Sequence, residues 1–288
     1  MHRVTGVGLL LTLLWWSAAA PAAQLRFEAP VAASQWRTTG SQMHCTLEHE
    51  IPRFGIAVFS QRAGGGLTFY LRSERVLPLQ MEAARVVVEP PAWNHYAVAR
   101  SLGEVERGTP DQLFALGAGE ALQLIMALEG GLFPVFRYQE GITRQRVDVA
   151  LSAVRFQEVL PRFRQCVASL FPFGFEDVAL SQIHFAFDRD ELTSAGREVL
   201  DRVVTWLFLD PSVRFAIVEG HTDSRGASGY NEALSRRRAE TVHAWLVKQG
   251  VSPERLELRY AGEQRPVADN RSDAGRARNR RVEIRLQR

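Results

Sequence analysis

The feature that most constrains this 288-residue chain is an apolar run that ends in glycine and is followed, across a polar loop, by an amphipathic helix. Residues 213–219 are mostly apolar, lie between Pro211 and Gly220, and predict a buried strand. Residues 231–249 carry apolar side chains at helical spacing and end before Gly250, at a C-cap position. The pattern therefore predicts a strand joined to a helix, as in α/β domains.

Two charged residues stand out in this strand–helix unit. Asp223 follows the end of the predicted strand, where α/β sheets usually place ligands. Arg238 lies four residues from both Leu234 and Val242, inside the apolar stripe of the helix. A buried unpaired guanidinium is costly, so Asp223 is the nearest candidate partner. The residues alone leave two interpretations open: a structural ion pair that locks the loop to the helix, or a ligand-binding pair.

Size and composition indicate an ordinary globular protein. The chain is long enough for two domains, and 46% of its residues are hydrophobic and 23% charged. The formal net charge is only +3. This mild excess does not favour a nucleic-acid partner, and we expect none.

The first residues predict an export signal. Arg3 supplies the positive start, residues 7–16 an apolar core too short to span a bilayer, and the Ala-Pro-Ala triplet at 20–22 a cleavage site. An uncleaved anchor is the alternative, which the short core disfavours. We therefore expect residues 1–22 to be a signal peptide and the mature chain to be exported without a membrane span.

Cys45 and Cys166 are the two cysteines of the chain. In an oxidising compartment such a pair favours a disulfide over free thiols. In the chain-entropy model, a bridge that closes so long a loop stabilises the fold by roughly 4–5 kcal/mol, because it restricts the unfolded chain. Metal binding is the weaker alternative, because the cysteines form no CxxC cluster and the histidines show no ligand spacing around them. We predict no metal and no other cofactor.

The pattern along the chain predicts an α+β protein in two domains. A mostly-β N-terminal domain with a helix is expected over residues 23–173, and an α/β domain with a mixed sheet and helices on one side over residues 174–288. In the first domain we expect strands at 55–59, 67–71, 85–88 and 147–151, a helix at 110–128 and a shorter helix at 163–170. In the second we expect strands at 183–187, 256–260 and 282–286, and a helix with Thr193 as its N-cap.

Four motifs mark the second domain. They are Ile-His-Phe-Ala-Phe-Asp at 183–188, Glu-Gly-His-Thr-Asp at 219–223, Leu-Ser-x-x-Arg-Ala at 234–239 and Asn-Arg-Arg-Val at 279–282. In order and spacing they resemble the OmpA-like peptidoglycan-binding domain. That resemblance implies a ligand, the diaminopimelate-containing stem peptide of the Gram-negative cell wall.

The resemblance also implies site residues. Asp223 and Arg238 match the family's Asp and Arg, and the free end of diaminopimelate is a zwitterion. A carboxylate suits its ammonium and a guanidinium its carboxylate, which favours the ligand-binding interpretation. The pocket lining implied by the same motifs comprises Thr222, Asn231 and Leu234. Two further motif residues, Asn279 and Arg281, are expected either in the groove wall or in a structural role.

The first domain carries a second resemblance. The segment Ser34-Gln35-Trp36, the motif from Cys45 to Ala63 and the distant Cys166 resemble a family of flagellar motor proteins with this two-domain layout. The resemblance implies a periplasmic ring, the T ring, beneath the outer-membrane rings of the basal body. Its implied partners are the basal-body rings, a companion ring protein and the stator complex, whose assembly it would support.

We therefore expect a non-enzymatic binding and assembly protein that is associated with the flagellar basal body and the cell wall. A wall-anchored OmpA-like envelope protein without a flagellar role is the alternative. A wall hydrolase is disfavoured, because no paired acid and base stands out in the first domain. His221 beside Asp223 has no nucleophile placed by a recognisable motif, and two residues at this spacing are weak grounds for a metal site.

Overall fold

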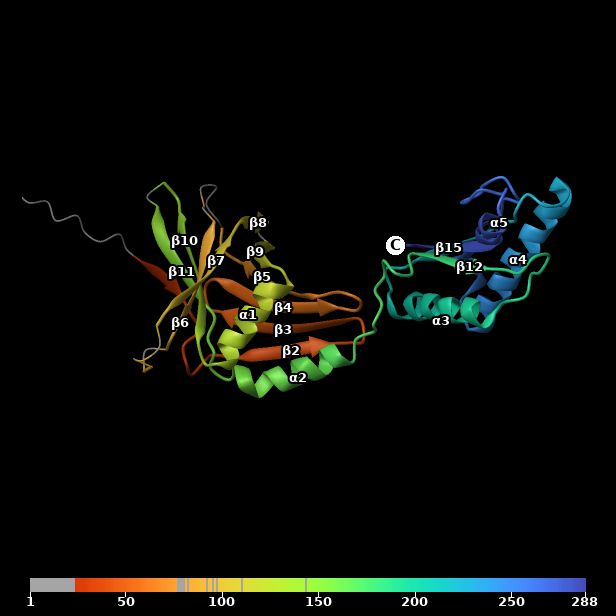
Figure 1. Cartoon of the computed structure of the whole chain (residues 1–288). Helices are drawn as coiled ribbons and strands as arrows, with labels where there is room; N and C mark the ends of the chain where they lie inside the picture. The colour runs from red at the N-terminus through yellow and green to blue at the C-terminus, as the bar shows by residue number, and fades with distance from the viewer. Residues whose placement is uncertain are drawn as a thin grey trace, which may run out of the picture.

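The computed structural model describes residues 24–76, 81, 83–91, 93–94, 96, 98–109, 111–142 and 144–288. The predicted signal peptide lies outside these residues. The described chain forms two lobes joined by one connecting segment (Figure 1). Each lobe has its own cluster of buried apolar side chains, which confirms an α+β protein with a β-rich N-terminal part.

Two sheets build the N-terminal lobe. The first is antiparallel and runs in the order β2 (Trp36–Gly40), β3 (His44–Ile51), β4 (Gly55–Arg62), β5 (Leu67–Ser73), β9 (Gln112–Leu116) and β8 (Arg107–Thr109). The second runs in the order β1 (Leu25–Phe27), β11 (Gln145–Ala150), β10 (Phe133–Glu140), β6 (Ala84–Glu89) and β7 (Arg100–Val105), with β1 parallel to β11.

Aromatic side chains from the two sheets meet in the core of this lobe. Phe69 of β5 packs against Phe59 of β4, with 4.8 Å between ring centroids, and stacks on Phe136 of β10 at 5.4 Å. All three rings are fully buried. Burial of this apolar area joins the two sheets into one layered body.

The prediction of a helix at 110–128 is wrong for the first half of this range. Residues 112–116 form β9, which pairs with β5 and β8, and α1 (Ala118–Glu129) begins only after Gly117. Leucines at helical spacing are also compatible with a buried strand. Here, backbone pairing with neighbouring strands makes these residues a strand. The second predicted helix starts earlier than expected: α2 (Phe156–Ala168) continues the buried face upstream across Pro161.

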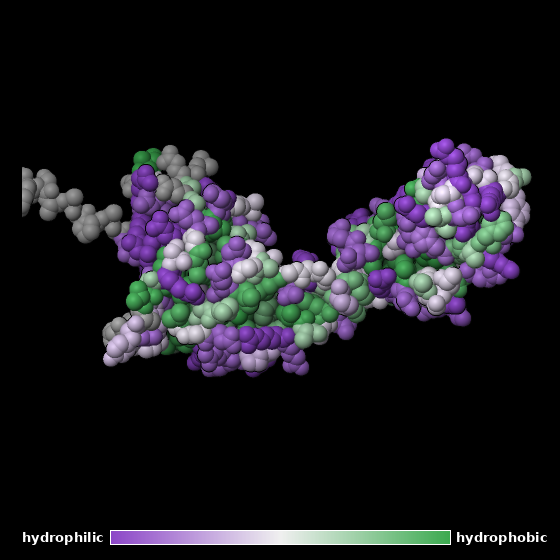
Figure 2. Space-filling view, in the orientation of Figure 1, coloured by the Kyte–Doolittle hydropathy of each residue, from purple (hydrophilic) through white to green (hydrophobic). Residues whose placement is uncertain are grey.

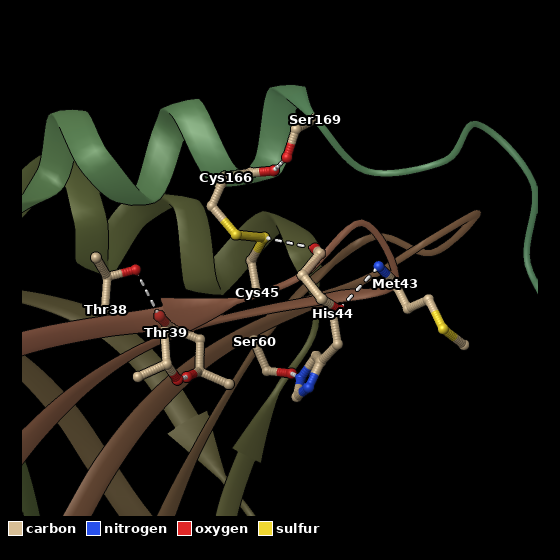
Figure 3. The surroundings of a disulfide bond; sticks show 10 residues. Thr38, Thr39, Met43, His44, Cys45, Ser60, Cys166 and Ser169 are labelled. Atoms are coloured by element: carbon tan, nitrogen blue, oxygen red, sulfur yellow. Dashed lines mark hydrogen bonds between the residues drawn. A yellow bond between two sulfur atoms is a disulfide. The ribbon is translucent and has the colours of Figure 1, made fainter. Parts of the chain in front are cut away.

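A disulfide joins α2 to the six-stranded sheet and confirms the predicted pair. Cys45 of β3 and Cys166 of α2 are bonded, with 6.0 Å between their Cα atoms and 121 residues of separation (Figure 3). Near the start of α2, Phe156 packs edge-on against Trp36, which stacks on His49. Covalent and aromatic contacts therefore hold α2 on the sheet at both ends.

The C-terminal lobe has a mixed four-stranded sheet, as predicted. Its order is β12 (Leu180–His184), β15 (Arg281–Gln287), β13 (Phe215–Gly220) and β14 (Leu256–Tyr260), and only β13 and β14 are parallel. Its helices are α3 (Ser194–Leu209), α4 (Ser228–Lys248), the short 3-10 turn η1 (Pro253–Arg255) and α5 (Asp273–Asn279). Thr193 caps α3 as predicted, because its side chain accepts a bond from the Gly196 N–H at 3.0 Å.

The two long helices cover the same face of this sheet. Ile183, Val282 and Gly220 lie side by side in one register row. An added Cβ on Gly196 of α3 would meet Ile183, and one on Gly220 would meet the backbone of α4. This confirms the expected arrangement, with helices on one side and the other face of the sheet free of α3 and α4.

The connecting segment touches both lobes. Phe171 donates its N–H to the Gln42 carbonyl, and its own carbonyl accepts from Gly64. The side chains of Phe171, Phe173 and Phe175 pack against the core of the C-terminal lobe. Figure 2 shows apolar side chains gathered along this stretch. The boundary predicted between 173 and 174 stays a prediction.

In the described part of the chain, no helix has the length and hydropathy required of a membrane span.

Candidate ligand-binding site

Arg238 is the central residue of the site and is fully buried on the inner face of α4. Its guanidinium donates to three carbonyl oxygens: Nε to Arg189 at 2.8 Å, Nη1 to His221 at 3.0 Å and Nη2 to Ala186 at 3.2 Å. It also lies over the ring of Phe185. The sequence correctly placed Arg238 in the apolar stripe, but carbonyl groups and not Asp223 satisfy it.

The carbonyl groups stabilise the guanidinium with their dipoles, and no carboxylate among the described residues bonds it. Burial, followed by the nearby charge of Arg280, lowers the pKa of Arg238 to about 10. Asp223 acts in the opposite direction as a neighbouring negative charge. A guanidinium in this setting remains charged at neutral pH and is suited to a carboxylate from outside.

Asp223 pairs with Arg280 and not with Arg238. Its side chain is 3% exposed, and Oδ2 forms an ion pair with Nη1 of Arg280 at 3.0 Å. Oδ1 accepts a bond from the Arg225 N–H at 3.0 Å, which turns the loop after β13. Arg280 therefore holds the carboxylate in place, and Asp223 and Arg238 face a common space without bonding each other.

A hollow of about 160 Å³ lies between these charges. It is bordered by the loop after β12, the loop after β13, the first turns of α4 and the residue before β15. All five predicted site residues line it, namely Thr222, Asp223, Asn231, Leu234 and Arg238. The remaining lining residues are Phe187, Asp188, Arg225, Gly226, Tyr230 and Arg280. The first five lie on the β13–α4 loop and on α4, as do Arg225, Gly226 and Tyr230, whereas Phe187, Asp188 and Arg280 come from two other segments.

The charged residues missed from the sequence carry clear roles. Arg280 neutralises Asp223, and Asp188 accepts a bond from the Tyr230 hydroxyl. Asp188 has a left-handed backbone with φ of 53°, which Asp tolerates better than most residues. The motif Asn-Arg-Arg-Val contains two arginines, and the structure places Arg280, between α5 and β15, at the hollow and Arg281, the first residue of β15, on the other sheet face.

Asn279 and Arg281 take the structural role that the sequence left open. The Asn279 side chain accepts bonds from the N–H groups of Val267 and Ala268 and donates to the Ala268 carbonyl. Arg281 points to the opposite sheet face, where Nε donates to Glu283 at 2.8 Å. Both residues fix the last loop and strand and do not line the hollow.

Close contact between β13 and α4 sets the depth of Arg238. An added Cβ on Gly220 would lie 2.0 Å from the Ser235 carbonyl oxygen, so only glycine permits this approach. Ser235, one turn before Arg238, accepts a bond from the Gly262 N–H at 3.1 Å through its hydroxyl. α4 therefore packs closest to the sheet at the helical turn that precedes and positions Arg238.

A second charged cluster lies on the open face of the sheet. Glu219, His221 and Glu283 place ligand atoms within 4.8 Å of one another, an arrangement able to hold a metal ion. Both carboxylates are already paired with arginines, at 2.6–2.8 Å, and these are Arg265, Arg281 and Arg285. Three guanidiniums against two carboxylates leave positive charge, which opposes a cation. We interpret the cluster as an ion-pair network, and the absence of a metal stays a prediction.

His221 in this cluster predicts a pH dependence of stability. Its ring nitrogens have no hydrogen-bond partner among the described residues, and burial, followed by the charge of Arg281, lowers its pKa to about 4. Below an unfolded pKa of about 6.5, the unfolded chain takes up the proton first. The destabilisation should therefore grow as pH falls from 6.5 towards 4.

We expect the unfolding free energy of wild-type protein to fall about 2 kcal/mol further than that of His221→Gln between pH 7 and pH 4.5. Urea melts of the C-terminal transition at both pH values measure the difference. Equal losses in the two proteins would contradict the assignment of this titration to His221.

Comparisons with known proteins agree with both lobes. Residues 27–172 match the MotY N-terminal domain family, and residues 184–280 match the OmpA family. The chain is 32% identical over 270 residues to the sodium-type flagellar protein MotY of Vibrio parahaemolyticus, covering 91% of this chain and 90% of that protein. It is 42% identical over 106 residues to the peptidoglycan-associated lipoprotein of Pseudomonas aeruginosa, covering 37% of this chain and 62% of that protein.

Among solved structures, the C-terminal domain of Helicobacter pylori MotB is similar at 26% identity, covering 38% of this chain and 84% of that one, with a TM-score of 0.35. The N-terminal family match covers half of the chain, and the Vibrio parahaemolyticus protein aligns over nearly its whole length. The chain therefore belongs to the MotY family.

Proposed function

We propose that this protein is a periplasmic, non-enzymatic component of the flagellar motor that binds peptidoglycan through its C-terminal lobe. The observation that carries the proposal is the hollow in which Arg238, held by three carbonyls, faces an Asp223 held by Arg280. Such an arrangement suits a ligand group with adjacent positive and negative charges. The free end of diaminopimelate in the stem peptide has this character.

Recognition follows from the geometry of the guanidinium. A guanidinium has five N–H donors, and three of those of Arg238 are used by the protein's own carbonyls. In our proposal, the two remaining N–H donors serve a ligand carboxylate that enters the hollow lined by Arg238. The ligand ammonium would then lie beside Asp223, whose oxygens retain further acceptor capacity. Noncovalent charge-assisted bonds are sufficient for this role.

The N-terminal lobe would attach the protein to the motor. Its match to the MotY N-terminal domain and the relative's name, a sodium-type flagellar protein, support this half of the proposal. In our proposal this lobe associates with the basal-body rings, as part of the T ring, and with a companion ring protein. Wall anchoring by the C-terminal lobe would then hold the ring fixed while stator units assemble around it.

Replacing Asp223 with Asn should abolish most binding to purified sacculi. The substitution keeps the size of the side chain but removes the charge that meets the ligand ammonium and pairs with Arg280. We expect the fraction pulled down with sacculi to fall at least tenfold, in line with losing a buried charge pair. Asp269→Asn, which removes an exposed carboxylate outside the hollow, is the matched control. Undiminished pull-down by Asp223→Asn in folded protein would refute the wall-binding site.

Deleting the gene should stop swimming while flagellar filaments still form. The expected reason is that stator units fail to assemble, and complementation with wild-type protein should restore motility. Swimming speed and filament counts by microscopy provide the measurement. Full motility of the deletion strain would instead favour an envelope protein anchored to the wall without a flagellar role.

A further inference from the structure

Arg225 is the exposed charge at the rim of the hollow. Its side chain is 55% exposed and lines the hollow together with buried Arg238 and partly buried Arg280. Its backbone N–H is fixed to Oδ1 of Asp223 at 3.0 Å. This bond fixes the backbone of Arg225, and with it the origin of the side chain, next to the carboxylate proposed to bind the ligand.

The guanidinium of Arg225 is held only weakly by the protein. Its ion pair with Asp273 is long, 3.4 Å, and that carboxylate is 88% exposed. Asp273 also bonds Arg276, which is the main cause of its lowered pKa. The remaining contact is with the face of Phe187, at 5.9 Å from the ring centroid. Exposed pairs of this kind contribute little, so Arg225 is easily released to another anion.

The charges around the hollow do not balance. Two carboxylates, Asp188 and Asp223, face three guanidiniums, those of Arg225, Arg238 and Arg280. The zwitterionic end of diaminopimelate is neutral and leaves one positive charge in excess. Since Arg238 and Arg280 are held inside by carbonyls and by Asp223, the surplus charge belongs to Arg225 at the rim.

We propose that Arg225 binds a second carboxylate of the stem peptide, the α-carboxylate of the D-glutamate that precedes diaminopimelate. This residue is linked through its side-chain carboxyl, which leaves the α-carboxylate free and negative. The inference rests on the proposed wall-binding function and adds a selectivity to it. Peptide with a free α-carboxylate binds better than peptide in which this group is an amide.

The setting of Arg225 favours this contact over a purely structural role. Hydrophilic side chains gather over the end of the C-terminal lobe that carries α5, the helix of Asp273 and Arg276 (Figure 2). A peptide leaving the hollow would cross this surface. A guanidinium can replace its weak pair with Asp273 by a two-point bond to the incoming carboxylate.

The test uses the full-length protein and two synthetic tripeptides, L-Ala-γ-D-Glu-meso-diaminopimelate and its α-carboxamide analogue, together with free meso-diaminopimelate. By isothermal titration calorimetry, wild-type protein should bind the carboxylate peptide about fivefold more tightly than the amide, as expected for a half-exposed ion pair. In Arg225→Gln this preference should disappear, while the variant still binds free diaminopimelate.

Arg236→Gln is the matched control, because Arg236 is similarly exposed and has one acidic partner, Glu240, on the outer face of α4. It should retain the fivefold preference. Equal affinity of wild-type protein for the two peptides, or a preference that persists in Arg225→Gln, would overturn the proposal while leaving diaminopimelate binding intact. If no protein binds free diaminopimelate, the proposed function itself fails instead.

Discussion

The C-terminal lobe is organised around one buried guanidinium. Arg238 bonds two carbonyl groups of the β12–α3 loop and one just after β13, so it ties two separate segments to α4. Removing a buried charge from water costs several kcal/mol unless polar groups replace the water, and here backbone dipoles do so. Because no carboxylate among the described residues bonds the guanidinium, the backbone dipoles stabilise its positive charge without neutralising it. The side chain that joins these segments is therefore also the one to which we assign the ligand carboxylate.

The rest of the site depends on that arrangement. Gly220 lets α4 approach β13 closely enough for the guanidinium to reach the loop carbonyls. Arg280, the residue before β15, then holds Asp223 at the opposite wall. Two opposite charges are thus kept apart by their own separate partners. A ligand that carries both charges can bind without first breaking a bond between them, which limits the free-energy cost of opening the site.

Local patterns in the sequence predicted much of this architecture. The apolar stripe placed Arg238 on the inner face, the glycine-terminated strand placed Asp223 beyond β13, and the cysteine pair is bonded. The role of Arg280 could not be predicted this way, because its ion pair joins residues 57 positions apart and depends on how the turn between α5 and β15 packs beside the loop after β13. Residues 112–116 show a related failure, since the leucine spacing suited a helix and tertiary pairing made a strand.

The most direct test of the account is the affinity of free meso-diaminopimelate for wild-type protein and for Arg238→Lys, measured by isothermal titration calorimetry. Lysine keeps the charge but lacks the planar fork that bonds the loop carbonyls and the ligand carboxylate together. Thermal melts establish that the variant is folded. The account predicts one binding site in wild-type protein and at least a tenfold loss of affinity in Arg238→Lys. Equal affinity of the two folded proteins would contradict it.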